Sequence, residues 1–183
     1  MFYDSFRHHR RSIRLQGYDY SSEGAYFVTI CVKDRENLFG GIAAGELWLN
    51  KFGGAVVNSW QWLEERYSYV RLDEWVLMPN HLHGIIVIDP PCRGDSRIAP
   101  TTPIVRKHLG RLIGAFKTIS TKEINQMRGT TEQPIWQRNY YERIIRNEAE
   151  LNRIRQYIYD NPANWESDPD NVHVGVVRER PLC

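Results

Sequence analysis

The alternation of apolar and polar positions along the chain predicts several β-strands. Val, Ile and aromatic residues favour extended structure, and turn residues bound the segments in which they gather. Six segments are predicted as strands: 25–32, 46–50, 70–77, 81–88, 135–145 and 172–177. The first is apolar on both faces, so we expect it in the middle of a sheet. Strands 70–77 and 81–88 flank a Met-Pro-Asn break and should pair as a hairpin.

Apolar residues at spacings of three and four predict three helices. These helices cover 52–67, 104 to about 127, and the segment from Asn147 to about Asp160. Asn147 is a suitable N-cap for the last helix, and Pro162 ends it. Gly110 and Gly114 weaken the middle helix by about 1 kcal/mol each relative to Ala, so we expect close packing there.

The order of these elements mixes strands and helices without strict βαβ alternation. It predicts an α+β fold, in which a sheet carries helices packed on one face. A length of 183 residues suits one domain. Pro-rich residues 89–103 are predicted to form a flexible linker within this domain.

Composition excludes some classes of protein. No apolar run is long enough to span a membrane, and the first residues lack the apolar core of a secretion signal. Three scattered cysteines argue against a disulfide framework and for a reducing compartment, so we expect a cytoplasmic protein.

The net charge of +2 is unevenly distributed. The first eighteen residues hold several basic side chains, including Arg10, Arg11 and Arg14, against one acid, Asp4. Such a basic arm with interleaved aromatic residues could lie on phosphates. The alternative is an ordinary solvated segment.

His81 and His83 suggest a metal site. Side chains alternate faces along a strand, so both imidazoles point the same way. Neutral imidazole suits Mn, Zn or Fe better than Mg. The alternative is a pair of ordinary polar residues, and two histidines need a third ligand from elsewhere.

Tyr157 and Asn161 could complete the site. Positions i and i+4 share one face of a helix, so a phenol and an amide oxygen lie side by side. If that face covers the histidine strand, Asn161 can be the third ligand and Tyr157 a nucleophile. The alternative is that Tyr157 is a core aromatic at helical spacing.

Three motifs in order resemble those of a known family. They are Met-Pro-Asn-His-x-His at 78–83, Trp-Gln-Arg-Asn-Tyr-Tyr at 136–141, and Tyr-Ile-x-x-Asn-Pro at 157–162. Together they resemble the single-tyrosine HUH transposases, and most closely the REP-associated tyrosine transposases. The resemblance covers about residues 12 to 165.

The resemblance implies a ferredoxin-like or RRM-like antiparallel sheet and an enzyme that cuts single-stranded or hairpin DNA with Mg or Mn. It implies that Tyr157 attacks a phosphate and leaves a 5′-phosphotyrosine link and a free 3′-OH. It assigns His81, His83 and Asn161 to the metal. It also suggests a homodimer, which no residue of the sequence determines.

The chain then divides into a basic arm at 1–20, a catalytic domain at 21–166 and a tail at 167–183. Basic side chains could contact phosphates, and two aromatic ones could stack on bases. The candidates beyond the arm are Arg106, Arg111, Lys117, Trp136, Arg138, Tyr140 and Arg143. The alternative is surface charge and core aromatics.

The leading hypothesis is a metal-dependent DNA strand transferase. One alternative is a non-catalytic or regulatory protein that binds REP-like DNA hairpins. A metal-dependent hydrolase that uses the two histidines with water is a third hypothesis, but it gives Tyr157 no role.

Overall fold

The computed structural model describes residue 15, residues 17–90, residues 106–168 and residue 171. Several predictions therefore lie outside the described residues. They are the phosphate contacts of Arg10, Arg11 and Arg14, most of the 1–20 arm and of the 89–103 linker, and the strand at 172–177.

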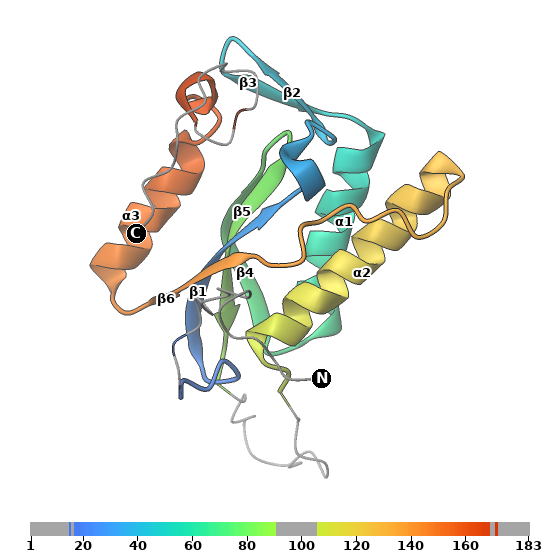
Figure 1. Ribbon diagram of the computed structural model, residues 1–183. Coiled ribbons are helices and arrows are strands. Elements are labelled where there is room, and N and C mark those ends of the chain that lie inside the picture. Colours follow the sequence, from blue (N-terminus) through green and yellow to red (C-terminus); the bar gives the residue numbers. More distant parts are fainter. Residues whose placement is uncertain (1–14, 16, 91–105, 169–170, 172–183) are drawn as a thin grey trace, which may run out of the picture.

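Four antiparallel strands form the central sheet (Figure 1). They are β1 (Gly24–Cys31), β4 (Val70–Leu77), β5 (His81–Ile88) and β6 (Tyr141–Ile145), in the order β4-β5-β1-β6. β1 is therefore an inner strand, as its apolar faces predict. β4 and β5 pair as the predicted hairpin, with Leu77 opposite Leu82.

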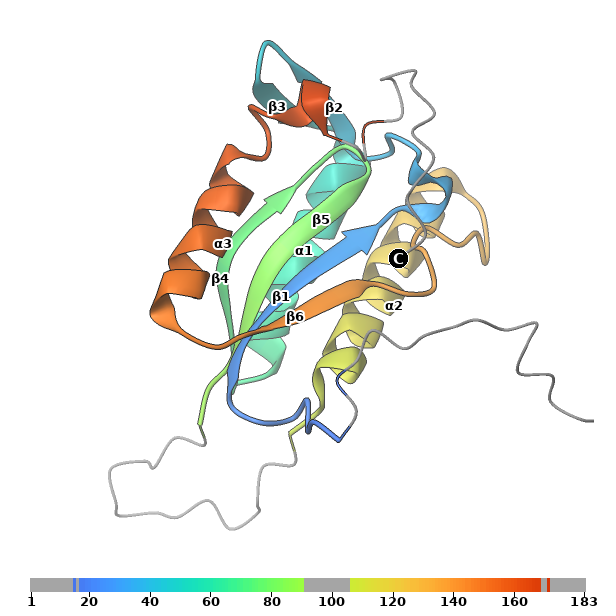
Figure 2. The same cartoon turned by 60° about the vertical axis from the view of Figure 1, so that its left-hand side comes forward.

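Two long helices cover one face of this sheet and a third lies on the other (Figure 2). α1 (Lys51–Arg66) and α2 (Leu109–Arg128) share one side, and α3 (Glu148–Asp160) lies on the opposite side. Without α3, the order β1-α1-β4-β5-α2-β6 is the ferredoxin-like βαββαβ arrangement. The predicted α+β, ferredoxin-like fold class is confirmed, with α1 and α2 as the helices packed on one face.

Alternation along β1 divides the core in two. Tyr26, Val28 and Ile30 are fully buried against the α1 and α2 side. Phe27 points the other way and joins a smaller cluster that includes Ile158 of α3. Each fully buried side chain of this size contributes about 1.5–3 kcal/mol. α3 thus rests on a much smaller apolar contact than α1 and α2.

A second, two-stranded sheet is formed by β2 (Gly40–Ala43) and β3 (Glu46–Leu49). It follows a short 3-10 helix, η1 (Lys33–Arg35). The Phe39 N–H donates to the Pro79 carbonyl (3.0 Å), which joins this hairpin to the Met-Pro-Asn turn. The strand predicted at 46–50 is present, whereas its glycine-containing partner gave no strand pattern.

Two predicted boundaries are wrong. The helix predicted from residue 104 begins at Leu109, because His108 is extended and the Leu109 N–H donates to the Tyr20 carbonyl. The strand predicted at 135–145 covers only β6. In the segment before it, Trp136 makes one isolated bridge with Val32, and the Lys117 ammonium holds the carbonyls of Gln137 and Asn139.

A glycine with no room for a side chain lies outside the predicted pair Gly110 and Gly114. An added Cβ at Gly114 would meet nothing within 4 Å, so the predicted close packing there is wrong. A Cβ at Gly84 would lie 2.7 Å from the Trp60 ring and 3.2 Å from the Trp75 Cβ. Gly84, directly after His83, is what lets the indole of Trp60 reach the sheet.

β4 contains one extra residue relative to β5. Leu72 pairs with Ile86 and Trp75 with Gly84, so three steps along β4 match two along β5. Such a bulge bends an edge strand and re-aims its side chains. Asp73 lies within it and is bonded to Arg155 of α3 through two contacts of 2.7 Å.

A short 3-10 helix, η2 (Trp165–Ser167), follows α3. None of the described helices combines the length and the apolar character needed to cross a lipid bilayer.

Candidate active site

His81 opens β5 and is fully buried. Its Nδ1 lies 2.8 Å from Asn80 Oδ1. The Asn80 Nδ2 donates to the Arg35 carbonyl, so the amide oxygen is the group that faces His81. His81 Nδ1 must therefore carry the proton and donate it to Asn80. This leaves a lone pair on Nε2, a buried atom with no hydrogen-bond partner in the described part of the chain.

His83 lies on the same face of β5, with its ring centroid 4.4 Å from that of His81. Its Nδ1 is 2.8 Å from the hydroxyl of Thr29, the residue opposite it on β1. Its Nε2 is 3.2 Å from the hydroxyl of Tyr157. Thr29 can accept from Nδ1, and His83 Nε2 then accepts from the phenol.

Tyr157 lies on α3, which the sequence folds locally through a good N-cap. The Asn147 side chain accepts from the Glu150 N–H at 2.9 Å, as predicted for a cap. One residue after Tyr157, Ile158 is fully buried and anchors the helix on the sheet. Tyr157 itself is 49% exposed, so the residue is not a core aromatic.

Asn161 is the C-cap of α3 and is 3% exposed. Its Oδ1 is buried without a hydrogen-bond partner among the described residues, as is His81 Nε2. Unsatisfied buried polar atoms are rare, and each calls for an explanation such as an ion. No group of three His, Cys, Asp or Glu in the described segments could hold a metal, so a third ligand would have to be of another kind. Two imidazole nitrogens and one amide oxygen fit a divalent transition metal.

Burial sets the charge of the site. It lowers the pKa of His81 well below the usual value, and His83 and Arg35 add to the effect. Burial also lowers the pKa of His83 to about 4. Both rings are therefore neutral at pH 7, which is the form that binds metals.

The phenol is also neutral at pH 7. Burial raises the pKa of Tyr157, the Asp168 carboxylate raises it further, and the Asn161 amide opposes them. Tyr157 can act as a nucleophile only if another group draws off its proton.

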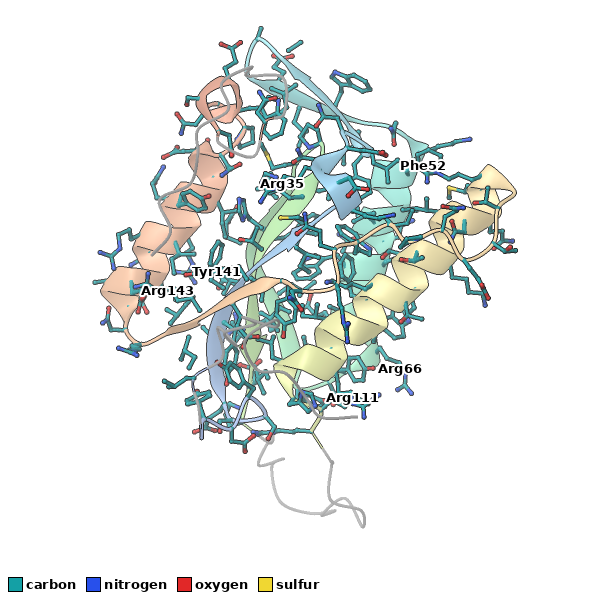
Figure 3. The ribbon with its side chains drawn as sticks, in the orientation of Figure 1. Arg35, Phe52, Arg66, Arg111, Tyr141 and Arg143 are labelled. Atoms are coloured by element: carbon teal, nitrogen blue, oxygen red, sulfur yellow. The ribbon has the colours of Figure 1, made fainter. Side chains whose placement is uncertain are left out.

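The segment after α3 covers one side of the site. Trp165 is 6% exposed and its ring centroid lies 6.1 Å from that of His81. Asp168 follows η2, and burial raises the pKa of its carboxyl above the usual value, although the nearby Arg35 opposes this. Figure 3 shows Arg35 at the end of the sheet where β5 begins.

The predicted stacking residues lie differently. Trp136 is 6% exposed, packs between Phe39 and Phe116, and donates from Nε1 to Ser120 at 2.9 Å. It is a core residue, so a stack of Trp136 on a base is a wrong prediction for this conformation. Tyr140 is half-buried beneath the Lys117 ammonium, 5.5 Å from the ring centroid.

The predicted phosphate contacts do not form one surface. Lys117 is largely buried on backbone carbonyls, and desolvation lowers its pKa to about 8. Arg111 lies on α2, away from the side of α3 (Figure 3). Arg138 is exposed, Arg106 is partly buried, and Arg143 is paired with Glu150 at 2.6 Å. Their contacts with DNA stay predictions.

Sequence reasoning missed several residues of the site. Thr29 orients His83 across the sheet, and only the register of β1 with β5 could have found it. Phe27 stacks on His83 with ring centroids 5.6 Å apart, and it too could have been found only from the strand register. Asn80 lies within the Met-Pro-Asn-His-x-His motif, but the orientation of its amide can be assigned only once the Arg35 carbonyl is placed.

Comparison with known proteins places the chain among relatives. No family model matches it. An uncharacterised protein of Haemophilus influenzae is 42% identical over 171 residues, which cover 91% of this chain and 95% of that protein. A second H. influenzae protein, named "Putative REP-associated tyrosine transposase", is 24% identical over 163 residues, 89% of this chain and 80% of its own length.

A solved structure of a REP-associated tyrosine transposase bound to a REP hairpin is similar in fold. Its TM-score is 0.55 at 19% identity, over 84% of this chain and 74% of the other. The resemblance that the motifs predicted is thereby confirmed. The chain belongs to one family with the uncharacterised H. influenzae protein and has the fold of a REP-associated tyrosine transposase.

Proposed function

We propose that this protein nicks and joins single-stranded or hairpin DNA through a 5′-phosphotyrosine intermediate, in a metal-dependent reaction. The observation that supports this most directly is the 3.2 Å contact between the Tyr157 hydroxyl and His83 Nε2. It puts the hydroxyl of a half-exposed tyrosine beside paired imidazoles. Relatives named as transposases support a transposase-type function.

Tyr157 supplies the nucleophile. Its Oη forms a bond to phosphorus and loses the phenol proton, while the bond from phosphorus to the 3′-oxygen breaks. The leaving oxygen takes up a proton and becomes a free 3′-OH. Attack by another 3′-OH reverses these bond changes and releases Tyr157, so no external energy source is required.

His81, His83 and Asn161 would hold the divalent cation, Mg or Mn. When bound, such an ion can polarise a phosphoryl oxygen and lower the cost of the charge that develops there. The protein contributes orientation: Asn80 fixes the protonation of His81, and Thr29 orients His83. Imidazole ligands favour Mn over Mg.

The substrate class is inferred from the relatives. The structure with similar fold is described as a transposase bound to a REP hairpin. We propose that this chain also takes hairpin DNA that carries an unpaired segment.

The test is covalent capture of labelled hairpin DNA in the presence of Mn or Mg. We expect a protein–DNA adduct that is stable to denaturation and absent in Tyr157→Phe. Tyr159→Phe is the matched control, because Tyr159 is on the same helix and 74% exposed. Tyr141→Phe tests the other exposed tyrosine near the site. An adduct that survives Tyr157→Phe contradicts the proposal, and tight binding without any adduct supports the alternative, a regulatory hairpin-binding protein.

A further inference from the structure

A groove of about 1020 Å³ lies between α2 and the segment that follows it. This segment, residues 130–138, returns along the helix (Figure 1). Two cross-links hold it against α2. The Asn125 side chain donates from Nδ2 to the Gln133 carbonyl at 3.0 Å, and Lys117 donates from Nζ to the Gln137 carbonyl at 2.8 Å. The groove therefore has two fixed walls.

The distance between the two cross-links sets the length of the groove. Lys117 and Asn125 are separated by slightly more than two turns of α2, or about 12 Å along the helix axis. An extended peptide advances about 3.3 Å per residue, so about four residues fit between the cross-links. The groove thus has the length of a short linear segment of protein.

The bottom of the groove is apolar. Ile135 and Trp136 line it and are 2% and 6% exposed. The Trp136 indole N–H already donates to Ser120 at 2.9 Å, so the ring offers the groove only carbon atoms. The Thr118 hydroxyl donates to the Gly114 carbonyl within α2, so it also needs no partner from a ligand. A polar group at this bottom would lose its water without gaining a hydrogen bond, so an apolar side chain suits it better.

The rim of the groove is cationic. Lys122 of α2 and Arg138 of the returning segment are both exposed and line the groove from its two sides. The salt bridges within residues 17–90 and 106–168 include neither side chain. Glu132 is the one acidic side chain among the described residues that line the groove. Carboxylates placed between Lys122 and Arg138 would therefore meet complementary charge.

Charge argues against the two ends of this chain as the occupant. The first eighteen residues hold several arginines against one acid, Asp4. The last residues hold Arg178 and Arg180 against one acid. Lys122 and Arg138 would repel both segments.

A single strand of DNA also suits the groove poorly. Proteins hold single strands with exposed aromatic rings on which bases stack, whereas the Trp136 side chain is almost completely buried. α2 lies on the opposite side of the sheet from α3, which carries Tyr157 (Figure 2). A strand held at Tyr157 would have to cross the sheet to reach this groove.

We propose that the groove binds a short acidic segment of a partner protein, about four residues long, with one apolar side chain among its carboxylates. Lys122 and Arg138 bind the carboxylates, and the apolar side chain packs on Ile135 and Trp136. Arg138 then contacts a carboxylate rather than the DNA phosphate predicted from the sequence. This site is separate from the chemistry proposed for Tyr157.

The test titrates fluorescein-labelled tetrapeptides with the full-length protein and follows fluorescence anisotropy. Asp-Asp-Leu-Asp is the probe. Asp-Asp-Gly-Asp lacks the apolar side chain, and Lys-Lys-Leu-Lys reverses the charge. We expect the probe to bind at least about tenfold more tightly than either of the others, because burial of a leucine side chain is worth more than that factor.

Three variants relate the binding to the groove, at a salt concentration that screens charges more than about 8 Å apart. Lys122→Glu with Arg138→Glu should weaken probe binding about tenfold or more, because like charges then face the carboxylates. Arg66→Glu with Arg153→Glu is the matched control, since it makes the same change of charge at exposed positions of α1 and α3 and should leave the affinity unchanged. Thr121→Trp fills the groove without a change of charge and should also weaken binding.

Nitrogen-15 NMR locates the bound probe. The indole N–H resonance of Trp136 should shift when the probe is added. The corresponding resonance of Trp60, a fully buried residue of α1 that packs against Gly84, should stay in place.

Equal binding of the three tetrapeptides overturns the inference, as does equal probe affinity in the Lys122 and Arg138 double variant and its control. If single-stranded DNA shifts the Trp136 resonance and millimolar probe does not, the groove binds DNA and the inference is wrong. Self-association that Thr121→Trp abolishes would make the groove an interface between copies and would also overturn it.

The outcome is independent of the adduct experiment at Tyr157. Probe binding in a protein that forms no adduct removes the proposed function and supports the groove assignment. An adduct in a protein that does not bind the probe supports the chemistry and overturns the groove assignment.

Discussion

At the scale of single residues, the orientation of the Asn80 amide determines which nitrogen of His81 is free. Asn80 Nδ2 is held by the Arg35 carbonyl and Oδ1 accepts from His81 Nδ1. Loss of a group that hydrogen-bonds a metal-binding histidine typically lowers metal affinity by about 10- to 100-fold.

Asn80→Ala is therefore expected to weaken Mn binding by about 10- to 100-fold, because His81 loses the acceptor that fixes its proton on Nδ1. Isothermal titration calorimetry with Mn measures the change. Asn80→Asp keeps the acceptor and should retain most of the affinity, and Asn152→Ala, at an exposed position of α3, should change nothing. An Mn affinity that is equal in Asn80→Ala and the unaltered protein would contradict the role of Asn80.

Replacement by alanine should have opposite effects on stability at Gly84 and at Gly114. Gly84→Ala drives a Cβ into Trp60 beside His83 and should cost about 1–3 kcal/mol of unfolding free energy through overpacking. Gly114→Ala meets open space in a helix interior and should gain about 0.5–1 kcal/mol. Urea unfolding measures both. A neutral Gly84→Ala would mean that the Trp60 ring has room to move.

The residues that the sequence could indicate are those whose geometry is local. The period of two in β5 put His81 and His83 on one face, and the period of helix α3 put Tyr157 beside Asn161. Trp136 was misassigned because an aromatic in a polar motif does not reveal that Phe39 and Phe116 surround it. Thr29 could not be found without the pairing of β1 with β5.

At the scale of elements, α3 carries Tyr157, the proposed nucleophile, and rests on a small apolar contact with the sheet. Its contacts with the sheet include the cluster around Ile158 and the paired hydrogen bonds from Arg155 to Asp73 of β4. The ion pair of Glu150 with Arg143 of β6 and the contact of Tyr157 with His83 of β5 add to them. The bidentate pair fixes the helix in one rotation relative to β4.

The attachment should depend on pH. The Arg155 hydrogen bond lowers the pKa of Asp73 below its usual value. Its stabilisation is fully present above the unfolded pKa of about 3.9 and is lost as pH falls through the lower folded pKa. Arg155→Met should cost about 1 kcal/mol at pH 7, because the pair is partly exposed to solvent. The difference from the unaltered protein should shrink below about pH 4.

Unfolding free energies at pH 7 and pH 3 check this, with Arg66→Met as the control for loss of an arginine. A difference between Arg155→Met and the unaltered protein that is the same at both pH values would show that Asp73 is not the partner that matters.

The type of each element was predictable because apolar residues recur with a clear helix or strand period. Element boundaries were less predictable, because tertiary contacts determine them. α2 starts at Leu109 because tertiary hydrogen bonds hold the preceding residues extended. β6 starts late because the ammonium of Lys117, distant in sequence, captures the carbonyls that would otherwise pair.

At the scale of the whole molecule, the two faces of the sheet differ in what they pack against and carry. One face packs on α1 and α2 and forms the main core, while the other carries the histidines beneath α3. The predicted homodimer stays a prediction.

Metal binding should stabilise the whole fold, because a ligand that binds only the native state adds its binding free energy. Mn at 100 times its dissociation constant should add about 2.7 kcal/mol and raise the melting temperature. Differential scanning calorimetry measures the shift, and a chelator should reverse it. His81→Ala should lose the shift, and an equal shift in that variant would place the ion elsewhere.

The single extra residue in β4 reaches further than its own strand. It directs Asp73 toward α3, where Asp73 accepts from Arg155, and Arg155 lies half a turn before Tyr157 on the same helix. Deleting that residue would return Asp73 to regular alternation and shift α3 by about one strand step, 3.3 Å. A displacement of that size exceeds the 3.2 Å between the Tyr157 hydroxyl and His83 Nε2, so the position of Tyr157 over the histidines depends on the bulge in β4.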